Sequence, residues 1–350
     1  MGKSLNYRES LNLGGFAFVH GLVDAVCCAI LVGLYAKEHL PLPVLESMAV
    51  MYNILAFGLQ PILGMISDRF QNWRMQAIIS LIMIAFALTV TYFSPWIAVI
   101  IAGIGNAIFH IAGGSMSLRL NPERASAPGI FVAPGALGLL AGSWLGKHGG
   151  DSIHLYLGIG LILTSVLLWK LPQIELVDIP RPARVSSKKI YLLLAILISI
   201  SIRSLVGFMV SFPWKSSFAL MLILTLAISI GKGLGGILAD HCGRKKIVTI
   251  ALLASIPCLL LGSSIVWLGI LGMLLFNLTM PITLVAAASL LKGKPGFAFG
   301  LTCLALLIGY CPIVFGYQSL IRHPLALVIA IIISLFFLYN GLGNYSSQSR

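Results

Sequence analysis

The stretch that decides the fold occupies residues 236–246 and reads GILADHCGRKK. A similar, shorter stretch, GMISDR, occupies residues 64–69, so that Asp68 corresponds to Asp240. Asn106 and Asn277 form a second pair of similar positions, and the spacing within this pair differs from that between the two aspartates by a single position. Two matches at nearly one spacing predict that the chain consists of two duplicated halves.

The composition excludes a soluble globular protein. Of the 350 residues, 59% are hydrophobic and 9% are charged, with a mean hydropathy of +1.00, whereas about a quarter of the residues of an ordinary domain are charged. Long uninterrupted apolar runs predict membrane-spanning helices, because a spanning β-strand alternates apolar and polar residues. We therefore expect an all-α integral membrane protein with twelve transmembrane helices over residues 11–36, 44–66, 75–93, 96–118, 127–146, 153–171, 190–212, 217–239, 247–266, 267–290, 296–320 and 323–341.

The basic residues between these spans predict the orientation. Seventeen are expected on one face: Lys3, Arg8, Arg69, Arg74, Arg119, Arg124, Lys170, Arg181, Arg184, Lys188, Lys189, Arg244, Lys245, Lys246, Lys292, Lys294 and Arg350. Four are expected on the other: Lys37, Lys147, Lys215 and Arg322. An excess of Lys and Arg marks the cytoplasmic face, so both termini should lie inside the cell. Because the charge is spread over loops, the net charge of +13 indicates topology and not nucleic-acid binding.

The longest predicted loop divides the chain. Residues 172–189 contain three prolines and several basic residues, with six predicted spans on either side. We expect an N-terminal bundle over residues 1–171, a cytoplasmic linker over 172–189 and a C-terminal bundle over 190–350. In duplicated transporters of this kind, the solute site lies between the bundles near the middle of the membrane.

The stretch at 236–246 resembles the loop signature of the major facilitator superfamily, G-x-x-x-D-[RH]-x-G-R-[RK]. Its residues Gly236, Asp240, Gly243 and Arg244 match, and the first copy keeps Gly64, Asp68 and Arg69 before it departs at residues 71–72. The resemblance implies the major facilitator fold and a latch in which these residues hold the two bundles together in one state, the aspartate capping a helix N-terminus. The alternative is two unrelated basic turns that only fix topology.

Two shorter motifs resemble those of the fosmidomycin-resistance-like exporters. His20 and Asp24 match H-x-x-x-D, and residues 109–115, FHIAGGS, are similar to F-H-P-x-G-S with Ile111 in place of proline. This narrower resemblance implies export by proton antiport. It does not imply which compound is moved.

Asp24 is the acidic residue that falls in the middle of a predicted span. A carboxylate there costs about 2.5–3.5 kcal/mol on insertion scales, so it should face a cavity and a partner. His20 precedes it by one helical turn on the same face, and imidazole takes up a proton near neutral pH. We expect Asp24 and His20 to couple transport to protons. The alternative is a structural hydrogen bond between helices.

Further polar residues within spans are candidates for solute binding. Arg203 lies mid-span, where its guanidinium suits a carboxylate, phosphate or phosphonate, and it is also expected to neutralise Asp24 in one state. His110 belongs to the exporter-like motif, and Lys232 is either a contact or a side chain that reaches toward the interface. The full candidate set for solute binding is Arg203, His110, Asn106, Asn277, Lys232 and Gln60. Gly and Pro residues of the fifth span, and Pro281 in the tenth, predict bends.

We expect a monomeric secondary active transporter that exports a drug or metabolite in exchange for protons. No nucleotide-binding motif and no local cluster of catalytic groups occurs, so we expect no enzyme, no cofactor and no metal ion. The predicted partners are a small-molecule substrate, protons and the lipid bilayer of a cell membrane, of bacterial inner-membrane type. The alternatives are a proton-coupled importer of a small organic anion, and a sensor or assembly subunit with a transporter fold.

Overall fold

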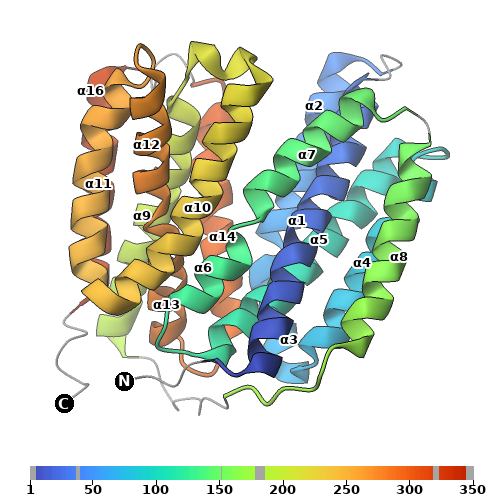
Figure 1. The fold of residues 1–350 in the computed structure, drawn as a ribbon, viewed down its shortest axis with the longest axis horizontal. Helices are drawn as coiled ribbons and strands as arrows, with labels where there is room; N and C mark the ends of the chain where they lie inside the picture. Colours follow the sequence, from blue (N-terminus) through green and yellow to red (C-terminus); the bar gives the residue numbers. More distant parts are fainter. Residues whose placement is uncertain (1–4, 37–39, 151, 178–185, 318–322, 344–350) are drawn as a thin grey trace.

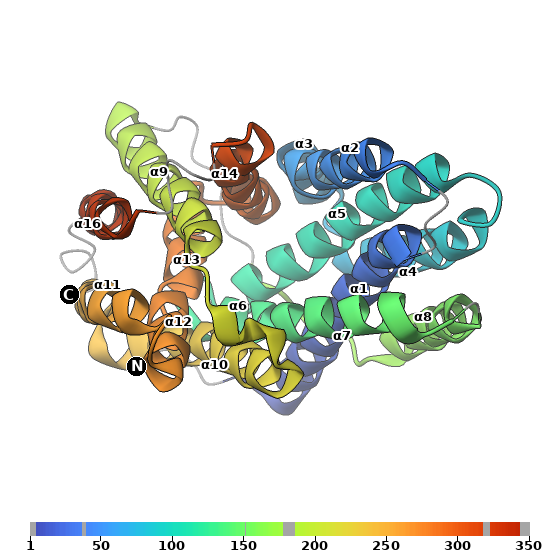
Figure 2. The ribbon, with the colours of Figure 1, turned by 90° about the horizontal axis from the view of Figure 1, so that it is seen from above.

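The regular structure of this computed structural model is entirely helical over the residues that it describes, which are 5–36, 40–150, 152–177, 186–317 and 323–343. Two bundles lie side by side (Figures 1 and 2). The first contains α1(Tyr7–Ala36), α2(Leu42–Asn53) continued by η1(Ile54–Gly58) and α3(Gln60–Phe70), α4(Trp73–Val90), α5(Pro95–Leu120), α6(Ser126–Val132) continued by α7(Gly135–His148), and α8(Ile153–Lys170). The second contains α9(Ser187–Met209), the short η2(Pro213–Ser216), α10(Phe218–Cys242), α11(Arg244–Leu261), α12(Val266–Asn277) continued by α13(Met280–Leu290), α14(Pro295–Val314) and α16(Pro324–Gly341).

These elements make twelve membrane-spanning segments within the described residues. Eleven of them are long and apolar enough to cross a bilayer by composition. The twelfth, α11, begins with Arg244, Lys245 and Lys246 and is otherwise uncharged over its 18 residues. The predicted all-α membrane fold with twelve helices in two bundles is confirmed, and the span limits differ from the prediction by a few residues.

Close packing of α1 against α7 positions the centre of the first bundle. A Cβ added at Gly138 would lie 2.1 Å from the carbonyl oxygen of Gly21, and one added at Gly142 would lie 2.1 Å from that of Ala25. Helices without a hydrophobic driving force between them approach closely where side chains are small. The glycines of α7 therefore bring its backbone directly onto the face of α1 that carries His20 and Asp24.

Three spans are interrupted near their middle. The fifth breaks between α6 and α7 at Pro134, and the tenth breaks between α12 and α13 just before Pro281, as the prolines predict. The second contains the π-helical turn η1, followed by Pro61 near the start of α3. The sequence analysis did not predict this third interruption.

The duplicated motif places a residue with positive φ at the corresponding position of both bundles. Gly243 has φ 91° between α10 and α11, and Gln71 has φ 53° between α3 and α4. The spacing between these two positions equals the spacing between Asp68 and Asp240. A left-handed residue other than glycine costs about 1–2 kcal/mol, so Gln71 keeps a turn that its side chain disfavours. A positive φ at matching positions is what duplicated halves predict, although ψ differs between them, at 15° for Gln71 and 137° for Gly243.

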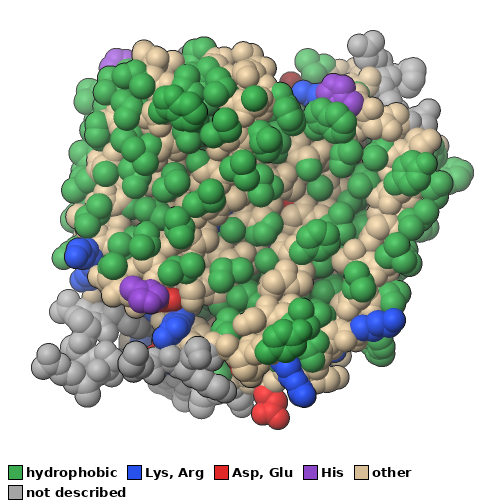
Figure 3. Space-filling model, viewed as in Figure 1, with side chains coloured by type: hydrophobic (Ala, Val, Ile, Leu, Met, Phe, Trp, Pro, Cys, Tyr) green, Lys and Arg blue, Asp and Glu red, His purple; other side chains and the backbone are tan. Residues whose placement is uncertain are grey.

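One face of the molecule carries most described basic loop residues, and we call it the basic face. It is the face at which α1 begins and α16 ends, and in Figure 3 most visible Lys and Arg lie along this lower edge, below a band of hydrophobic side chains. The described residues assigned to it are Arg8, Arg69, Arg74, Arg119, Arg124, Lys170, Lys188, Lys189, Arg244, Lys245, Lys246, Lys292 and Lys294. Outside the described residues lie Lys3, Lys37, Arg181, Arg184, Arg322, Arg350 and the middle of the predicted linker.

Candidate functional site

The first bundle holds a cluster of one carboxylate and two imidazoles near its centre. His20 and Asp24 lie one turn apart on α1, and His110 approaches from α5. Nε2 of His20 lies 3.3 Å from Oδ2 of Asp24, and Nε2 of His110 lies 3.5 Å from Oδ1. The two imidazole rings meet edge to face with their centroids 4.6 Å apart. Each histidine therefore faces a different oxygen of one carboxylate, and we call these three residues the triad.

Backbone carbonyls fix the tautomer of both histidines. Nδ1 of His20 lies 2.7 Å from the carbonyl oxygen of Phe131, and Nδ1 of His110 lies 2.9 Å from that of Asn106. A carbonyl only accepts, so each Nδ1 carries the proton and donates it. In a neutral ring the other nitrogen then presents a lone pair. Both lone pairs point at Asp24, an arrangement that requires a proton or another cation between each imidazole and the carboxylate.

The surroundings of the triad are tight and mostly apolar. The His20 ring stacks on Phe131 at 4.7 Å, and Phe109 flanks it. The side-chain exposures of His20 and Asp24 are 7% and 13%, so both groups are largely buried. A Cβ added at Gly135 would lie 2.6 Å from Oδ2 of Asp24 and 2.9 Å from Nε2 of His20. Glycine at this position leaves room between these two groups and the start of α7.

Asn106 donates a hydrogen bond to the Asp24 carboxylate, but its own amide oxygen has no partner among the described residues. Its Nδ2 lies 3.4 Å from Oδ1 of Asp24, a long hydrogen bond. Its Oδ1 is buried and has no hydrogen-bond partner among the described residues. Leaving such an oxygen unpaired typically costs about 1–3 kcal/mol. A buried acceptor beside the triad therefore remains available for a ligand.

The second bundle contributes two cationic side chains. Arg203 on α9 is 8% exposed and lies with its guanidinium 5.4 Å from the Phe276 ring centroid. Its Nε is buried without a partner among the described residues. Lys232 on α10 lies close enough to Asp24 and Arg203 for the charges to interact. Asp24 pairs with histidines in this state, so the pairing with Arg203 stays a prediction for another state.

The two remaining candidate amides each donate to a backbone carbonyl in this state, and the buried Oε1 of Gln60 has no partner among the described residues. Gln60 is fully buried, and its Nε2 donates to the Ala56 carbonyl at 2.7 Å. Asn277, at the end of α12, donates to the Met273 carbonyl at 2.8 Å. Both amides thus bond to their own helix, and their part in solute binding stays a prediction.

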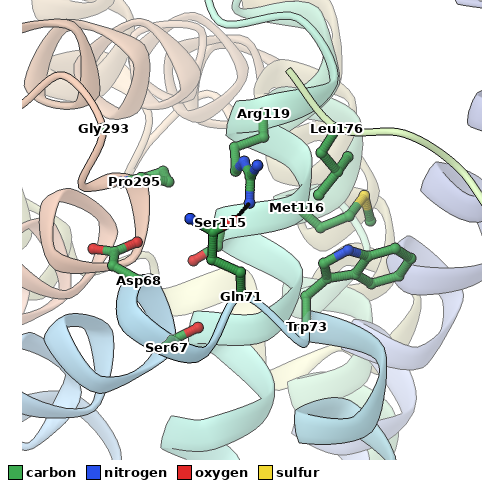
Figure 4. A pocket seen from close by; sticks show the side chains of 10 residues that line it. All are labelled: Ser67, Asp68, Gln71, Trp73, Ser115, Met116, Arg119, Leu176, Gly293 and Pro295. Carbon is green, nitrogen blue, oxygen red and sulfur yellow. Dashed lines mark hydrogen bonds between the residues drawn. The ribbon is translucent and has the colours of Figure 1, made fainter. Parts of the chain in front are cut away.

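The two motif aspartates cap helices of the opposite bundle. Asp68, at the end of α3, accepts hydrogen bonds from the backbone N–H groups of Gly296 and Phe297, both at 2.8 Å. These two residues open α14. An ionised carboxylate at a helix N-terminus satisfies unpaired N–H groups and the positive end of the helix dipole. Figure 4 shows Asp68 directed at the loop that contains Gly293 and Pro295.

Asp240 makes the same contact in the reverse direction. It accepts from the N–H groups of Ala125 at 2.7 Å and Ser126 at 3.0 Å, where α6 begins. The capped residues Ala125 and Gly296 have the same spacing in the sequence as Asn106 and Asn277, so the contacts are related by the internal repeat. Arg244 adds a third link across the bundles by donating to the Glu123 carbonyl.

Glycines make this cross-bundle contact possible. A Cβ added at Gly64 would lie 2.3 Å from the carbonyl oxygen of Gly296, and one added at Gly236 would lie 2.2 Å from that of Ala125. The predicted latch residues Gly64, Asp68, Arg69, Gly236, Asp240, Gly243 and Arg244 thus all lie at the basic face, with Arg69 and Gly243 exposed there. The structure is therefore closed at this face, and toward the other face the ribbons of α10 and α7 lie apart (Figure 1).

Comparison with known proteins gives the fold its name. No protein-family model matches the chain, and no curated protein does. Among solved structures, the Escherichia coli fucose:proton symporter FucP superposes with a TM-score of 0.71 at 11% identity over 95% of this chain and 97% of that one. The human organic anion transporter MFSD10 superposes with a TM-score of 0.71 at 17% identity over 94% and 99%. FucP in its outward conformation gives 0.64 at 11% identity over 94% and 98%. The chain has the major facilitator fold.

Proposed function

We propose that this protein is a secondary active transporter that moves a small solute across the membrane by alternating access, coupled to protons. The observation that carries the proposal is the triad. Its two imidazole lone pairs face one carboxylate inside a membrane-spanning bundle, so its charge state depends on how many protons it holds. Asp24 and His20 carry the coupling proton, and His110 shares it.

The latch supports alternating access. Asp68 and Asp240 each cap a helix N-terminus of the opposite bundle. These hydrogen bonds form only when the basic face is closed, and they break when the bundles rock apart. In this state Asp24 exchanges protons with the opposite face. Opening the basic face then exposes the triad to the other compartment. The basic loops favour a cytoplasmic location for that face, with both termini inside.

The cationic side chains of the second bundle suggest the solute's chemistry. Arg203 has a buried Nε without a partner among the described residues, and the charge of Lys232 interacts with both Arg203 and Asp24. An anionic group on the solute would satisfy the guanidinium by paired hydrogen bonds. Asn106, Asn277 and Gln60 would supply further polar contacts after rearrangement.

The direction of transport that we propose is export in exchange for protons, from the resemblance of His20–Asp24 and residues 109–115 to exporter motifs. Uptake of an organic anion with protons is the second candidate, and the buried guanidinium of Arg203 favours it. A membrane sensor or assembly subunit would have no need of a proton site that changes sides. We propose a monomer in a cell membrane, of bacterial inner-membrane type, with domain limits at residues 1–171, 172–189 and 190–350.

A flux assay tests the function directly. We expect purified full-length protein in liposomes to move protons when a transported solute is added, as followed by a pH-sensitive dye inside the vesicles. The direction of the proton signal relative to the solute distinguishes exchange from co-transport. Solute binding without proton or solute flux, across a panel of amphipathic drugs and organic anions, would contradict transport and favour the sensor.

Arg203 provides a prediction about solute affinity. We expect Arg203→Lys to raise the solute concentration for half-maximal transport by about 10–100-fold for an anionic solute, because a lysine loses the paired, planar contact, worth about 1.5–3 kcal/mol. A neutral analogue should be affected much less. Lys215 lies in η2, outside the spans, and Lys215→Arg gives the matched control. Equal loss for charged and neutral solutes would make Arg203 a packing residue.

A further inference from the structure

The triad has the ligand set of a transition-metal site. His20, Asp24 and His110 each offer one ligand atom, and these atoms all lie within 4.8 Å of one another. We propose that the triad binds one divalent transition-metal cation, with Zn²⁺ as the representative ion. The inference shares its residues with the proposed function but rests on their ligand geometry, and its test requires no transport.

Each histidine lies at a ligand-to-ligand distance from the carboxylate. Two ligands bound tetrahedrally to zinc at about 2.0 Å lie about 3.3 Å apart. Nε2 of His20 and Oδ2 of Asp24 are separated by 3.3 Å, and Nε2 of His110 and Oδ1 by 3.5 Å. These two distances involve different oxygens of Asp24, and the three ligand atoms lie within 4.8 Å of one another, so the side chains must draw together for one ion to contact all three.

Both histidines have the backbone hydrogen bond that is common among metal-binding histidines. A ligating imidazole commonly donates its other N–H to a backbone carbonyl, which fixes the tautomer and leaves the ligating nitrogen unprotonated. His20 does this with the Phe131 carbonyl, and His110 does it with the Asn106 carbonyl. Both Nε2 lone pairs then point at the carboxylate, so one cation between them satisfies all three groups.

A further ligand is present beside the triad, and α7 packs closely against it. A Cβ at Gly135 would lie 2.6 Å from Oδ2 of Asp24 and 2.9 Å from Nε2 of His20, so only glycine lets α7 approach these two ligand atoms without crowding them. The buried Oδ1 of Asn106 has no partner among the described residues. Three protein ligands with a fourth position open is the arrangement in which zinc keeps a water or an exchangeable ligand. A solute with its own donor atom would complete the shell.

The ligand set selects the class of metal. Two imidazoles and one carboxylate suit Zn²⁺, Fe²⁺, Co²⁺ and Ni²⁺, whereas Mg²⁺ and Ca²⁺ prefer oxygen ligands throughout. A divalent ion also balances the buried carboxylate more strongly than the nearby Lys232 ammonium does. All three ligands come from α1 and α5 of one bundle, so the site persists when the bundles move relative to each other.

Metal binding is measured on the purified full-length protein after chelation. We expect one Zn²⁺ per chain by equilibrium dialysis and elemental analysis, bound at least about 100-fold more weakly by Asp24→Asn and by His110→Ala. Gly135→Ala keeps every ligand but fills the adjacent space, and it should weaken binding about 10-fold or more. Cys242→Ser and His148→Ala remove exposed donor groups and should leave this affinity unchanged.

Cobalt gives a readout independent of protein yield. Co²⁺ bound by the triad should show visible absorption bands of a low-coordinate nitrogen–oxygen site, and Asp24→Asn should remove them while the thermal unfolding of the protein remains cooperative. Zinc uptake by the His20→Ala, His110→Ala double variant equal to wild type would overturn the proposal, as would Mg²⁺ binding as tight as Zn²⁺. If the wild-type protein binds zinc at the triad but moves no protons in the flux assay, only the proposed function is overturned.

Discussion

We expect Asp24→Asn to abolish accumulation of solute driven by a pH gradient. One proton exchanged per solute transfers about 1.36 kcal/mol per pH unit to the solute, which corresponds to about tenfold accumulation. Asparagine cannot release or take up the proton, so the accumulation ratio should fall to one. The measurement is solute distribution in liposomes with a one-unit pH gradient, with the membrane potential held at zero.

The same variant should retain exchange without a gradient. Asparagine mimics the protonated carboxyl group in size and in neutral charge, so solute binding and bundle rocking do not require the proton step. Labelled solute should therefore exchange across vesicles at equal pH at a measurable rate. Glu46→Gln neutralises an exposed acid on α2 and should accumulate solute as wild type does. Uphill transport by Asp24→Asn at the wild-type rate would make Asp24 structural, and His110 would be the next residue to substitute.

The fold could be predicted from the sequence more completely than the site, and the reason is physical. Apolar runs, basic loops and the two copies of the motif at Asp68 and Asp240 are local signals, and each was sufficient to place a span or a turn. The breaks at Pro134 and before Pro281 also follow from single residues. The π-helical turn at Ile54–Gly58 was not predicted, although Pro61 four residues after Phe57 cannot donate a hydrogen bond to its carbonyl.

The triad required three-dimensional information. His20 and Asp24 share a helix face, so their pairing followed from spacing, whereas His110 lies on a different span, far from Asp24 along the chain. Its mid-span depth made it a candidate, but only the packing of α5 against α1 brings its Nε2 to the carboxylate. The carbonyl partners that fix both tautomers are backbone atoms and have no sequence signature. A three-residue ligand set was therefore not expected from the sequence.

We expect Gly64→Ala to destabilise the state in which the basic face is closed, because Gly64 lies in the latch. The added Cβ would overlap the Gly296 carbonyl, since its ideal position is 2.3 Å from that oxygen. Overpacking of a tight contact typically costs about 1–3 kcal/mol, and here the cost falls only on the state in which α3 touches α14. A penalty of that size changes the population ratio of two states by about 5–150-fold. The variant should therefore favour the state that is open at the basic face.

Two measurements check this shift. Transport should slow at least about fivefold, because each cycle must pass through the closed basic face. A cysteine introduced at Ser115, whose hydroxyl oxygen lies 2.9 Å from the Cβ position of Gly296 and which is buried, should react faster with a membrane-impermeant maleimide in inside-out vesicles. Gly160→Ala is the matched control, since a Cβ there meets nothing within 4 Å. A latch variant must change the populations of the two states, so it must change the labelling rate at position 115. Slowed transport with an unchanged labelling rate would mean that the methyl group instead damages the packing within the first bundle.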